Sequence, residues 1–127
     1  MFNQMSKVTQ GSAGLGAAIG YFCGIGVVVS LPLVDNQDYD LIIDEGGLLK
    51  KVQVKTTGVK APSGNYEVQL KSVRSNKSVN TIKYFDSSKV DYLFILCDDS
   101  SKYLIPSSEV KVVGSLTLTQ ERVKYKI

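Results

Sequence analysis

Three polar side chains lie within two apolar segments that a two-glycine turn joins. Asp40 stands at the head of the first segment, and Gln53 and Lys55 stand inside the second. Successive side chains on a strand point to opposite faces, so a hairpin closed at Gly46-Gly47 can bring Asp40 beside Gln53 or Lys55. The carboxylate could bind a divalent cation through hard oxygen atoms. The lysine could position or activate a water molecule, or stabilise negative charge that develops on a phosphate.

The same arrangement also has a purely structural interpretation. Asp40 and a lysine on the neighbouring strand could form a cross-strand ion pair on a solvated face of the sheet, which would contribute less than about 1 kcal/mol. The pattern alone leaves both interpretations open, because each requires the same alternation and the same hairpin.

The elements around these residues predict an α+β or α/β fold. Apolar residues at helical spacing predict a helix over residues 11–24, preceded by a frayed lead-in over residues 1–9. The polar, basic stretch 73–83 is expected to be a loop. Apolar runs between turn signals predict strands over residues 27–31, 39–44, 48–57, 66–72, 90–97 and 102–105, then a helical turn over 106–110 and one or two edge strands in the tail 116–127.

The composition is that of a globular protein and removes several classes of site. The chain has 127 residues, 43% of them hydrophobic, which fits one domain over residues 1–127. There is no histidine, which excludes His-dependent triads, haem ligation by histidine and His-containing zinc sites. Cys23 and Cys97 show no metal-ligand spacing and are expected in a reducing compartment. A net charge of +3 permits a nucleic-acid partner without requiring one.

The uncharged stretch from Val8 to Val34 is long enough to span a bilayer. Its many glycines, and the β-branched block that Pro32 closes, favour a buried helix, a turn and a strand instead. We therefore expect no membrane association, with a small membrane protein as the alternative interpretation.

The blocks of sequence around Asp40 resemble the core of PD-(D/E)XK nucleases. The pattern Asp-x(n)-Gln-x-Lys follows a helix, a glycine, a valine-rich strand and Pro32, and the segments YEVQLKS and VDYLFIL come after it. The resemblance covers residues 11–110 and is strongest to small homing endonucleases associated with group I introns. It implies an α+β fold in which an N-terminal helix packs on a mixed, mainly antiparallel sheet of about five strands.

The resemblance also implies an activity, namely metal-dependent hydrolysis of phosphodiester bonds in duplex DNA by a site-directed, homing-type endonuclease. Mg²⁺ would be the cofactor, with Mn²⁺ as a substitute. Asp40 would bind the metal, and Gln53, in the place of the family's second acid, would assist through its carbonyl oxygen. Lys55 would orient or activate the attacking water.

The first helix departs from the family pattern. Related nucleases carry a glutamate there, whereas this helix has Leu15 at that position and no acid along its length. Because Gln53 is also neutral, another acid is expected to complete the site, with Asp38 as the first candidate and Asp35 and Glu67 as further ones. The alternative is a catalytically weak or inactive DNA-binding or interaction protein that keeps the nuclease fold.

A DNA substrate gives a role to the basic and polar residues that follow the expected third strand. They could contact phosphates and bases, or they could form an ordinary solvated surface. A chain this short can hardly span a long target site alone, so we expect a homodimer or homotetramer, acting in the cytoplasm of a bacterial or phage-infected cell. The small-faced helix and the tail are the candidate subunit contacts. The candidate DNA-binding residues are Lys60, Asn65, Tyr66, Gln69, Lys71, Arg74, Lys77 and Lys83.

Overall fold

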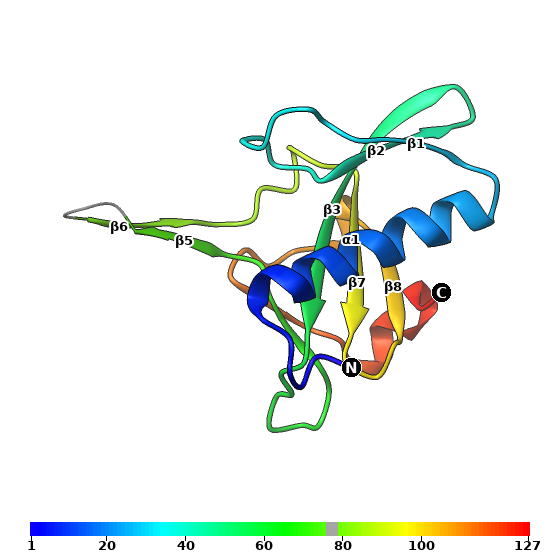
Figure 1. The fold of residues 1–127 in the computed structure, drawn as a ribbon. Coiled ribbons are helices and arrows are strands. Elements are labelled where there is room, and N and C mark those ends of the chain that lie inside the picture. The colour runs from blue at the N-terminus through cyan, green and yellow to red at the C-terminus, as the bar shows by residue number, and fades with distance from the viewer. Residues whose placement is uncertain (76–78) are drawn as a thin grey trace.

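A five-stranded mixed sheet forms the centre of the fold, with its strands in the order β1-β2-β3-β7-β8 (Figure 1). The computed structural model describes residues 1–75 and 79–127. β3 and β7 run parallel in the middle of the sheet, whereas the other neighbouring pairs are antiparallel. This sheet and its N-terminal helix confirm the predicted fold class. The strand bounds are Val28–Ser30 for β1, Leu41–Glu45 for β2, Leu48–Thr57 for β3, Tyr92–Cys97 for β7 and Lys102–Pro106 for β8.

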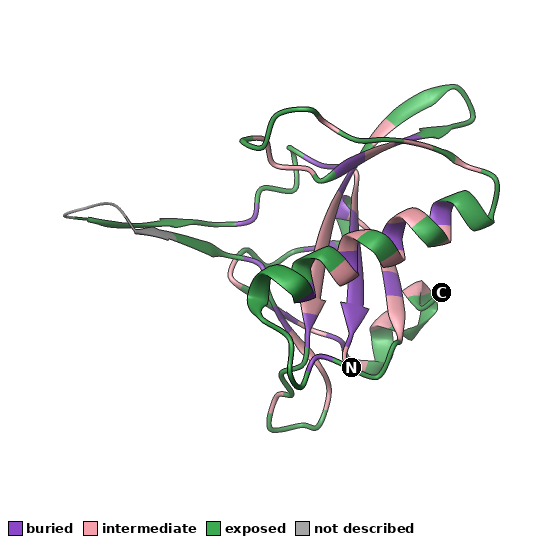
Figure 2. Ribbon diagram, viewed as in Figure 1, coloured by how far each residue is buried: buried purple, intermediate pink, exposed green. Residues whose placement is uncertain are grey.

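Helix α1 (Lys7–Gly24) lies across one face of the sheet (Figure 1). Every fourth residue from position 10 to position 22 is buried, which gives the helix a narrow stripe that faces the sheet. Phe22 at the end of this stripe packs in one core cluster with Val52 of β3 and Phe94 of β7. In Figure 2 the buried positions of the helix and of the central strands are purple, and the outer face of the helix is green.

The helix begins earlier than the sequence predicted. The lead-in expected over residues 1–9 is wrong from Lys7 onward, because Ser6 caps the helix. The Ser6 Oγ accepts a hydrogen bond from the Thr9 backbone N–H at 3.1 Å, which satisfies an amide that the first helical turn leaves without a partner.

The opposite face of the sheet is covered by a small second sheet. β4 (Glu67–Gln69) pairs antiparallel with β9 (Ser115–Thr117). Val68 and Leu116 from this pair pack with Leu93 of β7 in the second core cluster. β7 is therefore buried on both faces, which explains its nearly continuous apolar sequence.

The C-terminal tail differs from the prediction. Its first part forms β9, but Gln120–Tyr125 is a 3-10 helix, η2, rather than an edge strand. The Arg122 Nε donates to the Thr117 carbonyl at 3.1 Å, which folds the chain back on itself. The helical turn expected over residues 106–110 is confirmed as the 3-10 helix η1 (Ser107–Glu109).

A two-stranded arm projects from the body of the molecule (Figure 1). It consists of β5 (Ser72–Ser75) and β6 (Asn80–Lys83), which pair antiparallel with each other. The loop predicted over residues 73–83 is therefore wrong at 73–75 and 80–83, whereas 76–78 lie outside the described residues. Val73 and Ile82 are cross-strand partners, and their β-branched side chains favour an extended pair without any burial against the body.

The β2–β3 hairpin has the predicted two-glycine turn. Glu45 and Leu48 are partners in the strand register, so Gly46 and Gly47 form the whole loop. Their φ angles are +61° and +87°, the left-handed values that a tight hairpin turn requires and that glycine adopts without steric cost. The length of this turn fixes the register of the two strands.

The apolar stretch over residues 8–34 is divided between α1, a turn and β1. Within the described ranges, no helix combines the length and the apolar character needed to cross a membrane.

Gly14 is the point of closest approach between α1 and β3. A Cβ atom there would lie 2.5 Å from Thr56 Cγ2 and 3.2 Å from Val54 Cγ1. Thr56 cannot rotate away freely, because its Oγ1 accepts a hydrogen bond from the buried Gln10 Nε2 at 2.8 Å. The helix can lie this close to the sheet because residue 14 has no side chain.

We predict that Gly14→Ala lowers the free energy of unfolding by about 1–3 kcal/mol, because the added methyl group overpacks this contact. The matched control is Gly16→Ala on the exposed face, where a Cβ meets nothing within 4 Å. That change should raise stability by about 0.5–1 kcal/mol, because alanine loses less backbone entropy in a helix. Urea unfolding of both variants measures the two values, and equal effects would contradict the close-contact explanation.

Candidate active site

Asp40 is the residue just before β2, at the end of the β2–β3 pairing. The Asp40 backbone N–H donates to the Val52 carbonyl at 2.8 Å, which continues the strand pairing one residue beyond β2. The Asp40 side chain then takes over, because its Oδ2 accepts a hydrogen bond from the Val54 N–H at 2.7 Å. The register in which Leu41 faces Val52, extended by one residue, places Asp40 opposite Gln53. The predicted proximity of Asp40 to Gln53 and Lys55 is therefore present.

Lys55 lies between two hollows of the surface and lines both. The first is a groove of about 410 Å³ between α1 and β3, and Asp40 also lines it. The second is a cavity of about 60 Å³ that Gln53 also lines, on the side where the arm begins. The structure thus places the three predicted catalytic residues around one segment of β3, with Lys55 at the centre.

The helix contributes Leu15 to the wall of the groove that contains Asp40 and Lys55. Gly11, one turn earlier, lines it too. The position at which related nucleases would carry an acid therefore faces the candidate site, and here its side chain is a hydrocarbon. Leu15, which the sequence resemblance placed where an acid was expected, therefore lies in the wall of the candidate site.

The surroundings shift the pKa values of Asp40 and Lys55 in the directions that favour the neutral form of each side chain. Loss of hydration raises the pKa of Asp40 above its ordinary value of 3.8, although the Val54 hydrogen bond and the positive charge of Lys55 oppose the rise. Loss of hydration likewise lowers the pKa of Lys55, and the charge of Asp40 opposes that change. The negative charge of Asp35 adds to the rise in the pKa of Asp40, so these two carboxylates lie close enough to interact.

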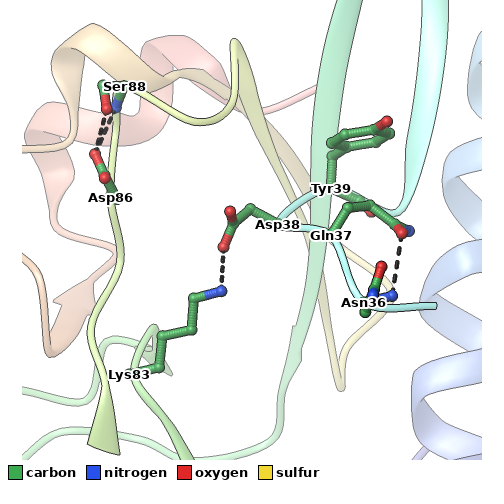
Figure 3. A network of polar contacts seen from close by, with 7 residues as sticks. All are labelled: Asn36, Gln37, Asp38, Tyr39, Lys83, Asp86 and Ser88. Atoms are coloured by element: carbon green, nitrogen blue, oxygen red, sulfur yellow. Dashed lines mark hydrogen bonds and ion pairs between the residues drawn. The ribbon is translucent and has the colours of Figure 1, made fainter.

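Asp38, the first candidate for an additional acid, is already engaged. Its Oδ1 lies 2.6 Å from the Nζ of Lys83, which belongs to strand β6 of the arm. Figure 3 shows the Lys83 side chain extending across the gap toward Asp38. Both residues line the 60 Å³ cavity together with Gln53 and Lys55.

The donor atoms at the site suit a hard cation with few protein ligands. Within residues 1–75 and 79–127 there is no group of three or more His, Cys, Asp or Glu side chains arranged to hold a metal. Asp40 has one carboxylate oxygen committed to the Val54 N–H, which leaves Oδ1, and Gln53 offers its amide oxygen. Mg²⁺ commonly binds through one or two carboxylates and otherwise retains water or substrate phosphate, so this small set of oxygen atoms fits it.

The candidate DNA-binding residues fall into separate regions. Arg74 lies in β5 and Lys83 in β6, whereas Lys77 lies outside the described residues. Lys60 and Tyr66 form an isolated bridge, and the Lys60 Nζ lies 5.1 Å from the centre of the Tyr66 ring.

The other three candidates are Asn65, Gln69 and Lys71, which lie between Lys60 and the arm in the sequence. The Asn65 side chain donates to the Ser63 Oγ at 3.2 Å. Gln69 and Lys71 line a third cavity, of about 350 Å³, that extends along β3 from Thr56. The structure therefore divides this set between the arm, the loop before β4 and a surface next to the catalytic groove.

Gln10 has a supporting role that the sequence pattern did not indicate. This residue is buried in α1 and donates to Thr56, one position after Lys55, so it ties the helix to the catalytic strand. Extending the helical stripe by one turn upstream of Gly14 would have placed Gln10 on the sheet-facing side.

Comparison with known proteins agrees with this geometry. The chain is similar to a solved bacterial homing endonuclease, I-Ssp6803I, with 26% sequence identity and a TM-score of 0.77, over 95% of this chain and 88% of that one. The comparison with curated proteins gave no match. The sequence model described as PD-(D/E)XK endonuclease matches residues 5–126. The chain therefore belongs to the PD-(D/E)XK endonuclease family.

Proposed function

We propose that this protein is a metal-dependent endonuclease that hydrolyses phosphodiester bonds in duplex DNA at a selected site. The observation that carries the proposal is the grouping of Asp40, Gln53 and Lys55 where β2 leaves β3, with the Asp40 carboxylate fixed by the Val54 N–H at 2.7 Å. A simple cross-strand ion pair would not require that the backbone orient the carboxylate, nor that a groove open beside it.

In this proposal Asp40 and Gln53 hold Mg²⁺, for which Mn²⁺ can substitute. The bound cation would lower the pKa of a water molecule and offset charge on the scissile phosphate. Lys55 orients that water and stabilises developing negative charge. Because its pKa is lowered, Lys55 is also a better proton acceptor near neutral pH than a fully hydrated lysine.

DNA would approach across the side of the molecule where the arm begins. The arm, Lys71 and Lys60 would contact phosphates, and Asn65, Tyr66 and Gln69 are available for further backbone or base contacts. By its similarity to a homing endonuclease, we propose site-directed cleavage of the homing type, performed by a homodimer or homotetramer of this single domain in the cytoplasm of a bacterial or phage-infected cell.

A second candidate function is supported by Leu15. A hydrocarbon side chain lines the groove where an acid would add charge, and Gln53 is neutral, so Asp40 is the only carboxylate among the three catalytic candidates. A nuclease fold with this electrostatic deficit could bind DNA without cleaving it.

Cleavage assays separate the two candidates. We predict that the purified protein nicks or cuts DNA carrying its target site when Mg²⁺ is present, and that Lys55→Met and Asp40→Asn each lower the rate by about 100-fold or more. Lys102→Met on β8, remote from the groove, should retain the parental rate. Salt-sensitive DNA binding by all four proteins without any cleavage would favour the binding protein instead.

The neutral amide at position 53 predicts a weak affinity for the metal. Gln53→Glu adds a negative charge beside Asp40, so the Mg²⁺ concentration that gives half-maximal cleavage should fall by about tenfold. Gln120→Glu adds the same charge at an exposed position of η2 and should leave that concentration unchanged. A Mg²⁺ titration of the cleavage rate measures both, and an unchanged or higher requirement in Gln53→Glu would exclude residue 53 from the metal site.

The raised pKa of Asp40 predicts a cost in stability. A folded state that raises the pKa of a carboxyl disfavours its ionised form, so the penalty is absent below the unfolded pKa and complete above the folded one. In the metal-free protein, Asp40→Asn should therefore raise the melting temperature at about pH 7.5 and lose this advantage at about pH 3.

Asp99→Asn is the control, and we expect it to change the melting temperature in the opposite direction. Hydrogen bonds from Ser101 lower the pKa of Asp99, so its charge contributes stability above the unfolded pKa that is lost as the pH falls. That variant should melt lower than the parent near neutral pH. Thermal unfolding with a chelator present measures both, and a lower melting temperature for Asp40→Asn at neutral pH would contradict the assigned penalty.

A further inference from the structure

The β5–β6 arm has few structural ties to the rest of the molecule. Its strands pair only with each other among the described residues, and every residue of β6 is exposed. The body holds the arm at its base, where Leu70 before β5 and Phe85 after β6 are buried in the second core cluster. Backbone hydrogen bonds from the Leu70 and Lys71 N–H groups to the Gly114 carbonyl, and from the Phe85 N–H to the Val113 carbonyl, also hold this base. These contacts fix where the arm begins, and the strands beyond them pair only with each other.

An ion pair joins the arm to the body. The Lys83 Nζ, on the last residue of β6, lies 2.6 Å from the Oδ1 of Asp38. Among residues 1–73 and 79–127, whose side chains the structure describes, it is the one salt bridge that involves the arm. Figure 3 shows the two side chains meeting across the space between the arm and the segment that leads into β2.

This ion pair is next to the candidate active site. Asp38 is two residues before Asp40 in the chain, and both partners line the 60 Å³ cavity with Gln53 and Lys55. Ser72 at the start of β5 and Tyr84 just after β6 lie at the base of the arm, and both line the same cavity. A change in the direction of the arm would therefore alter the wall of the cavity that contains two of the catalytic candidates.

We propose that Asp38 and Lys83 are a positioning pair, whose ion pair sets the direction in which the β5–β6 arm leaves the catalytic edge and so aligns DNA held by the arm with Asp40 and Lys55. The part that concerns DNA rests on the proposed function, whereas the part that concerns the direction of the arm does not. Asp38 then acts through Lys83 and is not the acid that completes the metal site.

The direction of the arm can be measured without any nuclease activity. Spin labels at Thr81→Cys on β6 and Ser108→Cys on η1, both exposed, report the distance between arm and body in a Cys23→Ser background. We expect a narrow distance distribution in the parent, a broader or displaced one in Asp38→Asn and in Lys83→Met, and recovery in the reversed pair Asp38→Lys with Lys83→Asp. Lys124→Met, which changes an exposed lysine on η2 away from the arm, should match the parent.

The pair is partly exposed, with 48% of the Lys83 side chain and 27% of the Asp38 side chain accessible, so it should bias the arm by a factor of up to about five. About 1 M salt should broaden the parent distribution toward that of Asp38→Asn. Distributions that are identical in the parent and in both single variants would overturn the proposal, as would failure of the reversed pair to restore the parental distance.

Cleavage kinetics test the second part. Each single variant should lower the rate on bound DNA by up to about fivefold with an unchanged Mg²⁺ requirement, and the reversed pair should recover most of the loss. If Asp38 were a metal ligand, Asp38→Asn would raise the Mg²⁺ requirement and the reversed pair, with a lysine at position 38, would be inactive. A parent that never cleaves DNA would refute the proposed function alone, since the spin-label distances would still decide the role of the ion pair.

Discussion

The candidate site depends on one hydrogen bond, in which the backbone N–H of Val54 donates to the carboxylate of Asp40 rather than to a strand carbonyl. Up to Asp40 the two strands pair through their backbones, and beyond it the neighbouring chain turns away. An N–H group of β3 would lose its partner at this point, and the side chain replaces the missing carbonyl at no cost in unsatisfied groups. The same contact fixes the orientation of Asp40, the one carboxylate among the described residues that line the groove, so the fold positions the residue to which we assign metal binding.

The remaining supports of β3 come from both faces of the sheet. Gly14 lets α1 approach Thr56 and Val54 closely, and the Gln10 side chain anchors the helix to Thr56 by a hydrogen bond. On the far side the second core cluster covers β7 and leaves Gln53 and Lys55 at its margin. Lys55 needs this rigid setting to keep its lowered pKa, because a mobile lysine side chain would recover its hydration.

The sequence predicted the β2–β3 hairpin well for a physical reason. A two-glycine turn permits one register, and alternation within Leu48–Thr57 then determines which side chains lie near Asp40. The arm was missed because its strands pair locally and the side chains described on them are exposed, so no alternation of apolar and polar residues marks them. The engagement of Asp38 by Lys83 was equally hidden, since the partners are far apart in the sequence and either residue alone resembles ordinary surface charge.

The position of the arm in the chain has a consequence for how such a protein can change over time. β3 and its parallel partner β7 are joined by a long connection, and the arm is part of that connection and contributes nothing to the pairing of the central sheet. Substitutions, insertions and deletions in its exposed strands are therefore tolerated by the core. The arm, to which we assign DNA contact, can diversify while the strand that carries Gln53 and Lys55 keeps its sequence, so the two proposed roles can evolve at independent rates.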